Sequence, residues 1–170
     1  KDIGALGADF DVSATYDYTM VSASSISPVS EKLLANMLEI VQQPAFSDQE
    51  IERVRKQTLA GIERRIDNPD GYADLAFAEF LYGTHPYGQP VSGTANTVPA
   101  IKKRNIVQFY LRAFQPGNSI LAVVGKFTPE LKAKIEQGFG AWEKRDASDF
   151  KFPLLTEVEG RQFRLVDKPG

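Results

Sequence analysis

A charged stretch of sequence between Ser47 and Pro69 constrains the fold of this chain more than any other segment. Ser47, followed three residues later by Glu50, matches the capping box that begins many helices, and Asn68-Pro69 is typical of a helix end. Glu, Arg and Lys cover most of the helix and predict a solvated surface. The apolar residues recur at helical spacing and predict one narrow buried stripe, made of Ile51, Val54, Thr58, Ile62 and Ile66.

The composition favours one buried core and argues against two classes of partner. The chain has 170 residues, of which 42% are hydrophobic and 25% charged, enough for one good core. Its formal net charge of −2 argues against a nucleic-acid-binding surface, which needs a basic face. No apolar run approaches the roughly 20 residues that span a bilayer, and the first residues do not resemble a signal peptide. We therefore expect no nucleic-acid partner and no membrane span in this chain.

Metal and thiol chemistry have few candidate residues. The chain contains no cysteine, which excludes disulfides, thiol catalysis and cysteine-based zinc sites, and it contains a single histidine, His85. Catalytic zinc usually takes three protein ligands, and histidine-rich sets are common. A zinc site made by this chain alone is therefore not expected, and His85 is interpreted as a loop side chain within the sequence THPYG.

The other segments alternate between strand-like and helical patterns. A period-two alternation and β-favouring composition predict the strands Asp9–Ala14, Tyr18–Ile26, Ser119–Gly125 and Gln162–Val166. Helical spacing predicts helices from Ser30 to just before Pro44, over Asp70–Tyr82, over Arg104–Phe114 and after Thr128. A loop is expected at Thr84–Pro99, after Gly83 at a helix end that favours positive φ. The order predicts an α+β fold, in which helices cover a mixed, largely antiparallel sheet.

Three sequence motifs, which together cover nearly the whole chain, carry a resemblance to a known family. They are GADFDVSATYDYT, then PAFSDQEIERVRKQTLAGIERRIDNP, and finally GTHPYGQPVSGT followed by FYLRAFQPGNSILAVVGKF. The chain resembles the amino-terminal half of an M16 peptidase, the family of pitrilysin, insulinase and mitochondrial processing peptidase. This resemblance implies an M16 metallopeptidase (LuxS/MPP-like) domain over residues 1–160 that lacks its first strand and helix. Residues 161–170 would then hold the last strand and the start of a linker to a second M16 domain.

The resemblance also implies where a zinc ligand should stand. Active members bind zinc through two histidines of a His-x-x-Glu-His helix and one distant glutamate, and the motif's own glutamate acts as general base. In an ungapped alignment the distant glutamate, which is the third zinc ligand, falls on Gly61, and a supporting acidic residue falls on Val54. The His-x-x-Glu-His motif would precede Lys1. Glu63 is the alternative ligand, although it lies about 200° around the helix from Gly61. We therefore expect no bound cofactor, in contrast to zinc in active relatives.

Peptide binding is a second expectation from the resemblance. In active relatives the substrate peptide pairs, as an extra strand, with a strand that lies beside the catalytic helix. The matching residues here are Asp9, Phe10, Asp11, Val12, Ser13 and Ala14. The alternative is that neighbouring chain covers this edge and that it binds nothing.

Three hypotheses for function follow. The first is a catalytically inactive M16 domain that binds or encloses unstructured peptides with an active M16 subunit or a second M16 domain. The second is an active zinc metalloendopeptidase whose motif lies upstream of Lys1. The third is a structural assembly subunit. A bacterial, periplasmic parent protein is expected, because inert M16 subunits of this style occur there.

Overall fold

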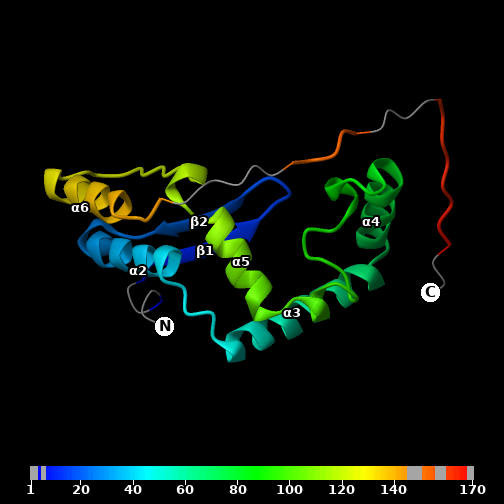
Figure 1. The fold of residues 1–170 in the computed structure, drawn as a ribbon, viewed down its shortest axis with the longest axis horizontal. Coiled ribbons are helices and arrows are strands. Elements are labelled where there is room, and N and C mark those ends of the chain that lie inside the picture. Colours follow the sequence, from blue (N-terminus) through cyan, green and yellow to red (C-terminus); the bar gives the residue numbers. More distant parts are fainter. Residues whose placement is uncertain (1–3, 5–6, 145–150, 156–159, 168–170) are drawn as a thin grey trace. The chain divides into compact units, whose positions relative to one another are not determined.

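A computed structural model describes residue 4 and residues 7–144, 151–155 and 160–167 of the chain (Figure 1). The chain divides into two compact units. The first unit comprises residues 1–46 and 104–149, and the second comprises residues 47–103 and 150–170. No described helix is long and apolar enough to cross a membrane.

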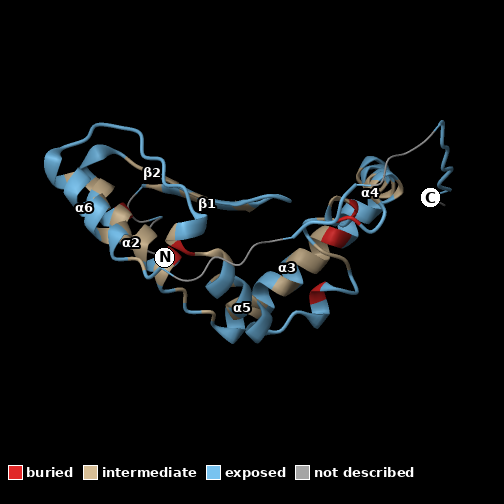
Figure 2. Cartoon of the chain, turned by 45° about the horizontal axis from the view of Figure 1, so that its top comes forward, coloured by how far each residue is buried: buried red, intermediate tan, exposed pale blue. Residues whose placement is uncertain are grey.

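The first unit begins with an antiparallel hairpin of β1 (Asp9–Ala14) and β2 (Thr19–Ser24). The Thr15 hydroxyl shapes the turn, because its oxygen accepts the backbone N–H groups of Asp17 at 3.2 Å and Tyr18 at 3.1 Å. The hairpin predicted from the sequence is therefore confirmed, with a second strand shorter than the predicted one. Exposed residues predominate on both strands (Figure 2).

Helix α2 (Ser30–Gln42) supports both the hairpin and helix α6 (Pro129–Gly140) (Figure 1). The short 3-10 turn η1 (Ser27–Val29) leads into α2. Gln42 Nε2 donates a hydrogen bond of 3.0 Å to the Gly138 carbonyl, and Lys134 pairs with Glu31. Leu33 and Val41 of α2 are buried and form the apolar centre of this unit.

Helix α5 (Lys103–Ala113) contacts α2 through Tyr110. The Tyr110 hydroxyl donates a hydrogen bond of 2.9 Å to the Val41 carbonyl, and the Tyr110 ring meets Phe46 edge-on at 5.3 Å between centroids. The 3-10 turn η4 (Pro116–Asn118) follows α5. The fully buried Gln115 stabilises this turn, since its carbonyl accepts from the Ser119 hydroxyl at 2.7 Å.

The second unit is built on α3 (Asp48–Asp67) and α4 (Pro69–Tyr82). α3 has the cap that the sequence predicts, because the Ser47 oxygen accepts from Glu50 N–H at 3.3 Å. Asn68, predicted only as the end of α3, also caps α4, since its Oδ1 accepts from Gly71 N–H at 2.9 Å. α4 ends at Gly83, whose φ of +54° confirms the expected left-handed position. The 3-10 turns η2 (Pro86–Gly88) and η3 (Val98–Ala100) lie in the loop that follows.

The α+β class is confirmed, but two predicted strands are wrong. Among the described residues only β1 and β2 pair, so Ser119–Gly125 and Gln162–Val166 have no ladder partner and are not strands. Ile120 and Leu165 are each 98% exposed. The residue types of both segments favour β-structure. A strand also needs a partner strand for its backbone hydrogen bonds, and the composition of a segment does not show whether one is present.

Candidate functional site

Gly61 lies in the middle of α3, with space where a ligand side chain would begin. A Cβ atom built there meets no heavy atom within 4 Å except Arg64 Nη2 at 3.9 Å. Long side chains on a helix point back towards its N-terminus, so Arg64 naturally extends over the residue three positions earlier. A cationic guanidinium therefore lies next to the position at which a metal-binding carboxylate was expected.

The other predicted positions on α3 do not form a metal site together with Gly61. Val54 lies about 20° around the helix from Gly61, so the two share one face, and Val54 is 49% exposed. Glu63 is exposed and lies on the far side of the helix from Gly61. Within the described ranges no group of three or more His, Asp or Glu residues could hold a metal ion. Gly61, Val54 and Arg64 supply none of the His, Cys or carboxylate ligands that zinc needs, so these three residues do not fit a zinc ion.

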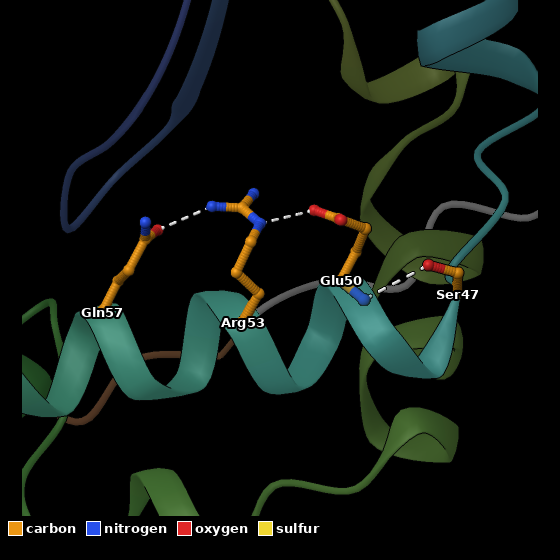
Figure 3. A network of polar contacts seen from close by, with 4 residues as sticks. All are labelled: Ser47, Glu50, Arg53 and Gln57. Carbon is orange, nitrogen blue, oxygen red and sulfur yellow. Dashed lines mark hydrogen bonds and ion pairs between the residues drawn. The ribbon is translucent and has the colours of Figure 1, made fainter.

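A polar network occupies the same face of α3 towards its N-terminus (Figure 3). Arg53 Nε donates to Glu50 at 2.7 Å, and Arg53 Nη1 donates to the side-chain oxygen of Gln57 at 2.9 Å (Figure 3). Gln57 stands four residues before Gly61. The network was not predicted from the sequence, although the spacing of Glu50, Arg53 and Gln57 places them on one face.

The predicted buried stripe of α3 needs one correction. Val54 and Ile66 are exposed, and Arg55 takes part in the buried face instead, with only 16% of its side chain exposed. Arg55 pairs with Glu52 at 3.0 Å and donates to the carbonyls of Val98 and Ile101. The charged residues of α3 are predicted to form a mostly solvated surface, and Arg55 is an exception to it. Its role is structural, because it holds the turn η3 against α3.

His85 is also a structural residue of its loop. It is only 9% exposed, and its Nδ1 atom accepts the Tyr87 backbone N–H at 3.2 Å. Its ring meets Tyr87 edge-on at 4.9 Å between centroids and lies 6.3 Å from Tyr82. Because Nδ1 accepts a hydrogen bond, it is not available to a metal ion. The interpretation of His85 as a loop side chain is consistent with these contacts.

The candidate peptide-binding strand Asp9–Ala14 is β1 of the hairpin. It pairs on one side with β2, and the described part of the chain places no strand on its other side. Asp9, Asp11, Val12 and Ala14 are exposed, whereas Phe10 and Ser13 are half-buried. β1 therefore offers an edge at which another extended chain could form backbone hydrogen bonds.

A cavity in the second unit does not include Gly61. It has a volume of about 440 Å³ and lies between the first turns of α3 and residues 99–103. Charged side chains at its wall pair with one another, with Lys103 Nζ 3.3 Å from Asp48 and Arg55 bound to Glu52. Their charges are thus already compensated.

Comparisons with known proteins place the chain in one family. The sequence model described as Insulinase (Peptidase family M16) matches residues 1–95, and the model described as Peptidase M16 inactive domain matches residues 100–170. An uncharacterized zinc protease of Rickettsia felis is 24% identical over 151 residues, which are 88% of this chain and 37% of that protein. One from Bacillus subtilis is 26% identical over 160 residues, or 94% of this chain and 37% of the relative.

Solved structures have the same fold. The crystal structure of a peptidase M16 inactive domain from Pseudomonas fluorescens is 31% identical with a TM-score of 0.80, and the match covers 91% of this chain and 38% of that one. A protease from Helicobacter pylori is 20% identical with a TM-score of 0.79 over 91% of this chain and 38% of that chain, and shows the fold alone. This chain thus spans less than two-fifths of the length of these relatives. With more than half of its residues matched by the family's own sequence model, the chain belongs to the M16 peptidase family.

Proposed function

We propose that this chain is part of a catalytically inert M16 subunit that binds or encloses peptides together with an active M16 subunit or a second M16 domain. The observation that carries the proposal is Gly61. The expected ligand carboxylate is missing there, and the guanidinium of Arg64 lies 3.9 Å from where its Cβ would stand. The positive charge of the Arg64 guanidinium repels a divalent cation at this position, and arginine offers it no ligand atom.

Family similarity supports the same proposal. Residues 100–170 match the model described as an inactive domain, and the similar Pseudomonas fluorescens structure carries the same description. A domain that has lost its metal can retain its shape, because the helix caps, the α2–α6 contact and the hairpin do not depend on zinc. Peptide binding is thus separable from hydrolysis.

We propose β1 as the element that binds peptide. Its outer edge offers backbone N–H and C=O groups whatever the state of the metal site, and this kind of strand addition is a common mode of peptide recognition. Affinity from backbone pairing depends little on the peptide's sequence. An unstructured, extended peptide is therefore the expected ligand.

Peptide cleavage and peptide binding by the full-length protein test the proposal together. The protein alone is expected to bind an unstructured fluorogenic peptide without cleaving it, and to increase cleavage when mixed with an active M16 homologue of the same organism. A matched control is the active homologue mixed with an unrelated protein. Chelator-sensitive cleavage by the isolated protein would reject the proposal.

The names of the relatives favour a second candidate, an active zinc metallopeptidase. In that case another acid must replace the ligand at position 61, and Glu63 is the candidate. The substitution Glu63→Gln distinguishes the two possibilities: it should abolish cleavage if Glu63 is a ligand, and it should change nothing if the subunit is inert.

A further inference from the structure

Within the described ranges, strand β1 pairs with β2 along one edge and has no neighbouring strand along the other. At the turn the Thr15 N–H donates to the Tyr18 carbonyl at 2.8 Å, next to the end of the ladder. Hydrogen-bonded pairs alternate along an antiparallel ladder, so the backbone groups of Asp9, Asp11 and Ser13 face β2. The backbone N–H and C=O groups that face the open edge belong to Phe10, Val12 and Ala14.

The side chains of β1 alternate between two faces of the hairpin. Asp9 and Asp11 lie on one face and are exposed. Phe10 and Val12 lie on the other face, where Phe10 is half-buried and Val12 is 53% exposed. β2 continues both faces, because a serine lies opposite each aspartate and an alanine and a valine lie opposite the apolar pair. β1 thus has an acidic face and an apolar face, both within the first unit.

The negative charge of the acidic face is not compensated by the described part of the chain. Residues 9–24 contain three aspartates and no lysine, arginine or histidine. Neither Asp9 nor Asp11 takes part in an ion pair or a side-chain hydrogen bond within the described ranges. A ligand that brings basic side chains to this face therefore meets carboxylates that no described neighbour has paired.

We propose that β1 binds extended peptides in which lysine or arginine alternates with apolar residues. This inference rests on the proposed peptide-binding function of β1 and names its ligand class. Backbone pairing accepts any sequence, whereas the side chains beside it distinguish one peptide from another. The preference therefore comes from the charge and the polarity of the two faces of β1.

The pleat of a sheet fixes which peptide residues meet which face. Residues directly opposite each other on paired strands point to the same face, with Cβ atoms roughly 4.5–5.5 Å apart. The peptide residues opposite Asp9 and Asp11 are two positions apart, so basic side chains at both positions reach the two carboxylates. The peptide residues opposite Phe10 and Val12 point to the apolar face, where apolar side chains cover surface that Val12 leaves exposed.

The experiment measures binding of three labelled peptides of equal length to the full-length protein by fluorescence anisotropy. The first peptide alternates lysine with valine, the second has the same residues with all lysines at one end, and the third alternates glutamate with valine. The first is expected to bind about tenfold more tightly than the third, because two attractive pairs replace two repulsive ones. It should bind about threefold more tightly than the second, in which every other lysine points to the apolar face.

Variants of the acidic face tie the preference to its two carboxylates. Asp11→Asn should reduce the tenfold preference for lysine over glutamate to about threefold, and Asp9→Asn combined with Asp11→Asn should remove it. Glu39→Gln is the matched control. It removes one negative charge from an exposed position of α2 in the same unit and should leave the preference unchanged.

A proline tests whether the open edge of β1 is the binding element. Val12→Pro removes an N–H that faces the open edge and leaves the ladder with β2 its hydrogen bonds. It should weaken binding of all three peptides by about tenfold. Urea unfolding of this variant checks that it is folded, and the aspartate variants test the proposal independently of it.

The possible failures are separable. Equal binding of the lysine and glutamate peptides by the unaltered protein overturns the charge preference and leaves peptide binding intact. Equal binding of the alternating and grouped peptides, or an equal effect of Glu39→Gln and Asp11→Asn, also overturns the inference, since general electrostatics would then explain the result. Unchanged binding by folded Val12→Pro overturns β1 as the element. Failure of every peptide to bind overturns the peptide-binding part of the proposed function, and this inference with it.

Discussion

Two glycines of the second unit show how differently the same residue type can be constrained. Gly61 is in a helix interior with open space around its missing side chain. Gly88 is in the 3-10 turn η2, where a Cβ atom would collide with the backbone carbonyl of Gly83. Gly88 is therefore required by the close approach of two backbone segments, whereas Gly61 is not required by the packing of its helix.

Substitution of these glycines by alanine should shift stability in opposite directions. Gly88→Ala should lower the free energy of unfolding by about 1–3 kcal/mol, because backbone atoms must move to admit a methyl group. Gly61→Ala is the control and should raise it by about 0.5–1 kcal/mol, because alanine restricts the unfolded chain and favours helix. Urea unfolding of the full-length protein measures both. Equal effects of the two substitutions would contradict the packing described for Gly88.

Contacts between helices depend on a third glycine. Gly138 of α6 lies so close to α2 that a Cβ atom there would come within 2.5 Å of Leu38 Cδ1. The Gln42 side chain spans the same contact through its hydrogen bond to the Gly138 carbonyl. The absence of a side chain at position 138 thus leaves the space that the Leu38 side chain occupies between α2 and α6.

A double-mutant cycle tests this contact. Gly138→Ala should destabilise the unaltered protein, because Leu38 must move, but should stabilise the Leu38→Ala variant, where the methyl group finds space. The expected coupling free energy is about 1–3 kcal/mol, measured from urea unfolding of the four proteins. Additive effects would mean that the two residues do not meet.

Helix α6 should also give the stability of the protein a dependence on pH. Hydrogen bonds from the backbone N–H of Glu130 and from the Thr128 hydroxyl, together with the nearby charge of Lys134, hold the pKa of the Glu130 carboxyl below its usual value. A lowered pKa in the folded state stabilises the protein above the unfolded pKa, and this contribution is lost as pH falls through the folded pKa.

The stability difference between the unaltered protein and Glu130→Gln should therefore be largest near neutral pH. It should shrink below about pH 4, where the carboxyl of the unfolded chain becomes protonated. Unfolding measured across this range checks the trend, with Glu136→Gln on the same helix as the control. A difference that grows towards acid pH would contradict the lowered pKa.

The sequence predicted helices more accurately than strands, for a physical reason. Helix signals are local: Ser47 and Thr128 each accept the N–H three residues on, and both caps lie within a few residues of the helix they begin. Strand pairing is non-local, so the apolar segment Ser119–Gly125 had the right composition but no pairing partner. The buried Arg55 was missed because its partners, Val98 and Ile101, lie more than forty residues away.

For the chain as a whole, the sequence identified the family, and Gly61 as the position of a missing ligand stays a prediction. It could not identify the environment of that position. Arg64 bends back over Gly61 because of helix geometry, and only the spacing of three residues hinted at this contact. The network from Glu50 to Gln57 likewise depends on side-chain conformations that a pattern of residue types leaves open.

Zinc content of the full-length protein is the most direct test of the central claim that Gly61 removes the metal site. After dialysis against a zinc buffer, the protein is expected to retain no stoichiometric zinc by elemental analysis. A known active M16 peptidase serves as the control and should retain it. Retention of one zinc ion per chain, lost in Glu63→Gln, would contradict the claim and assign Glu63 as the ligand.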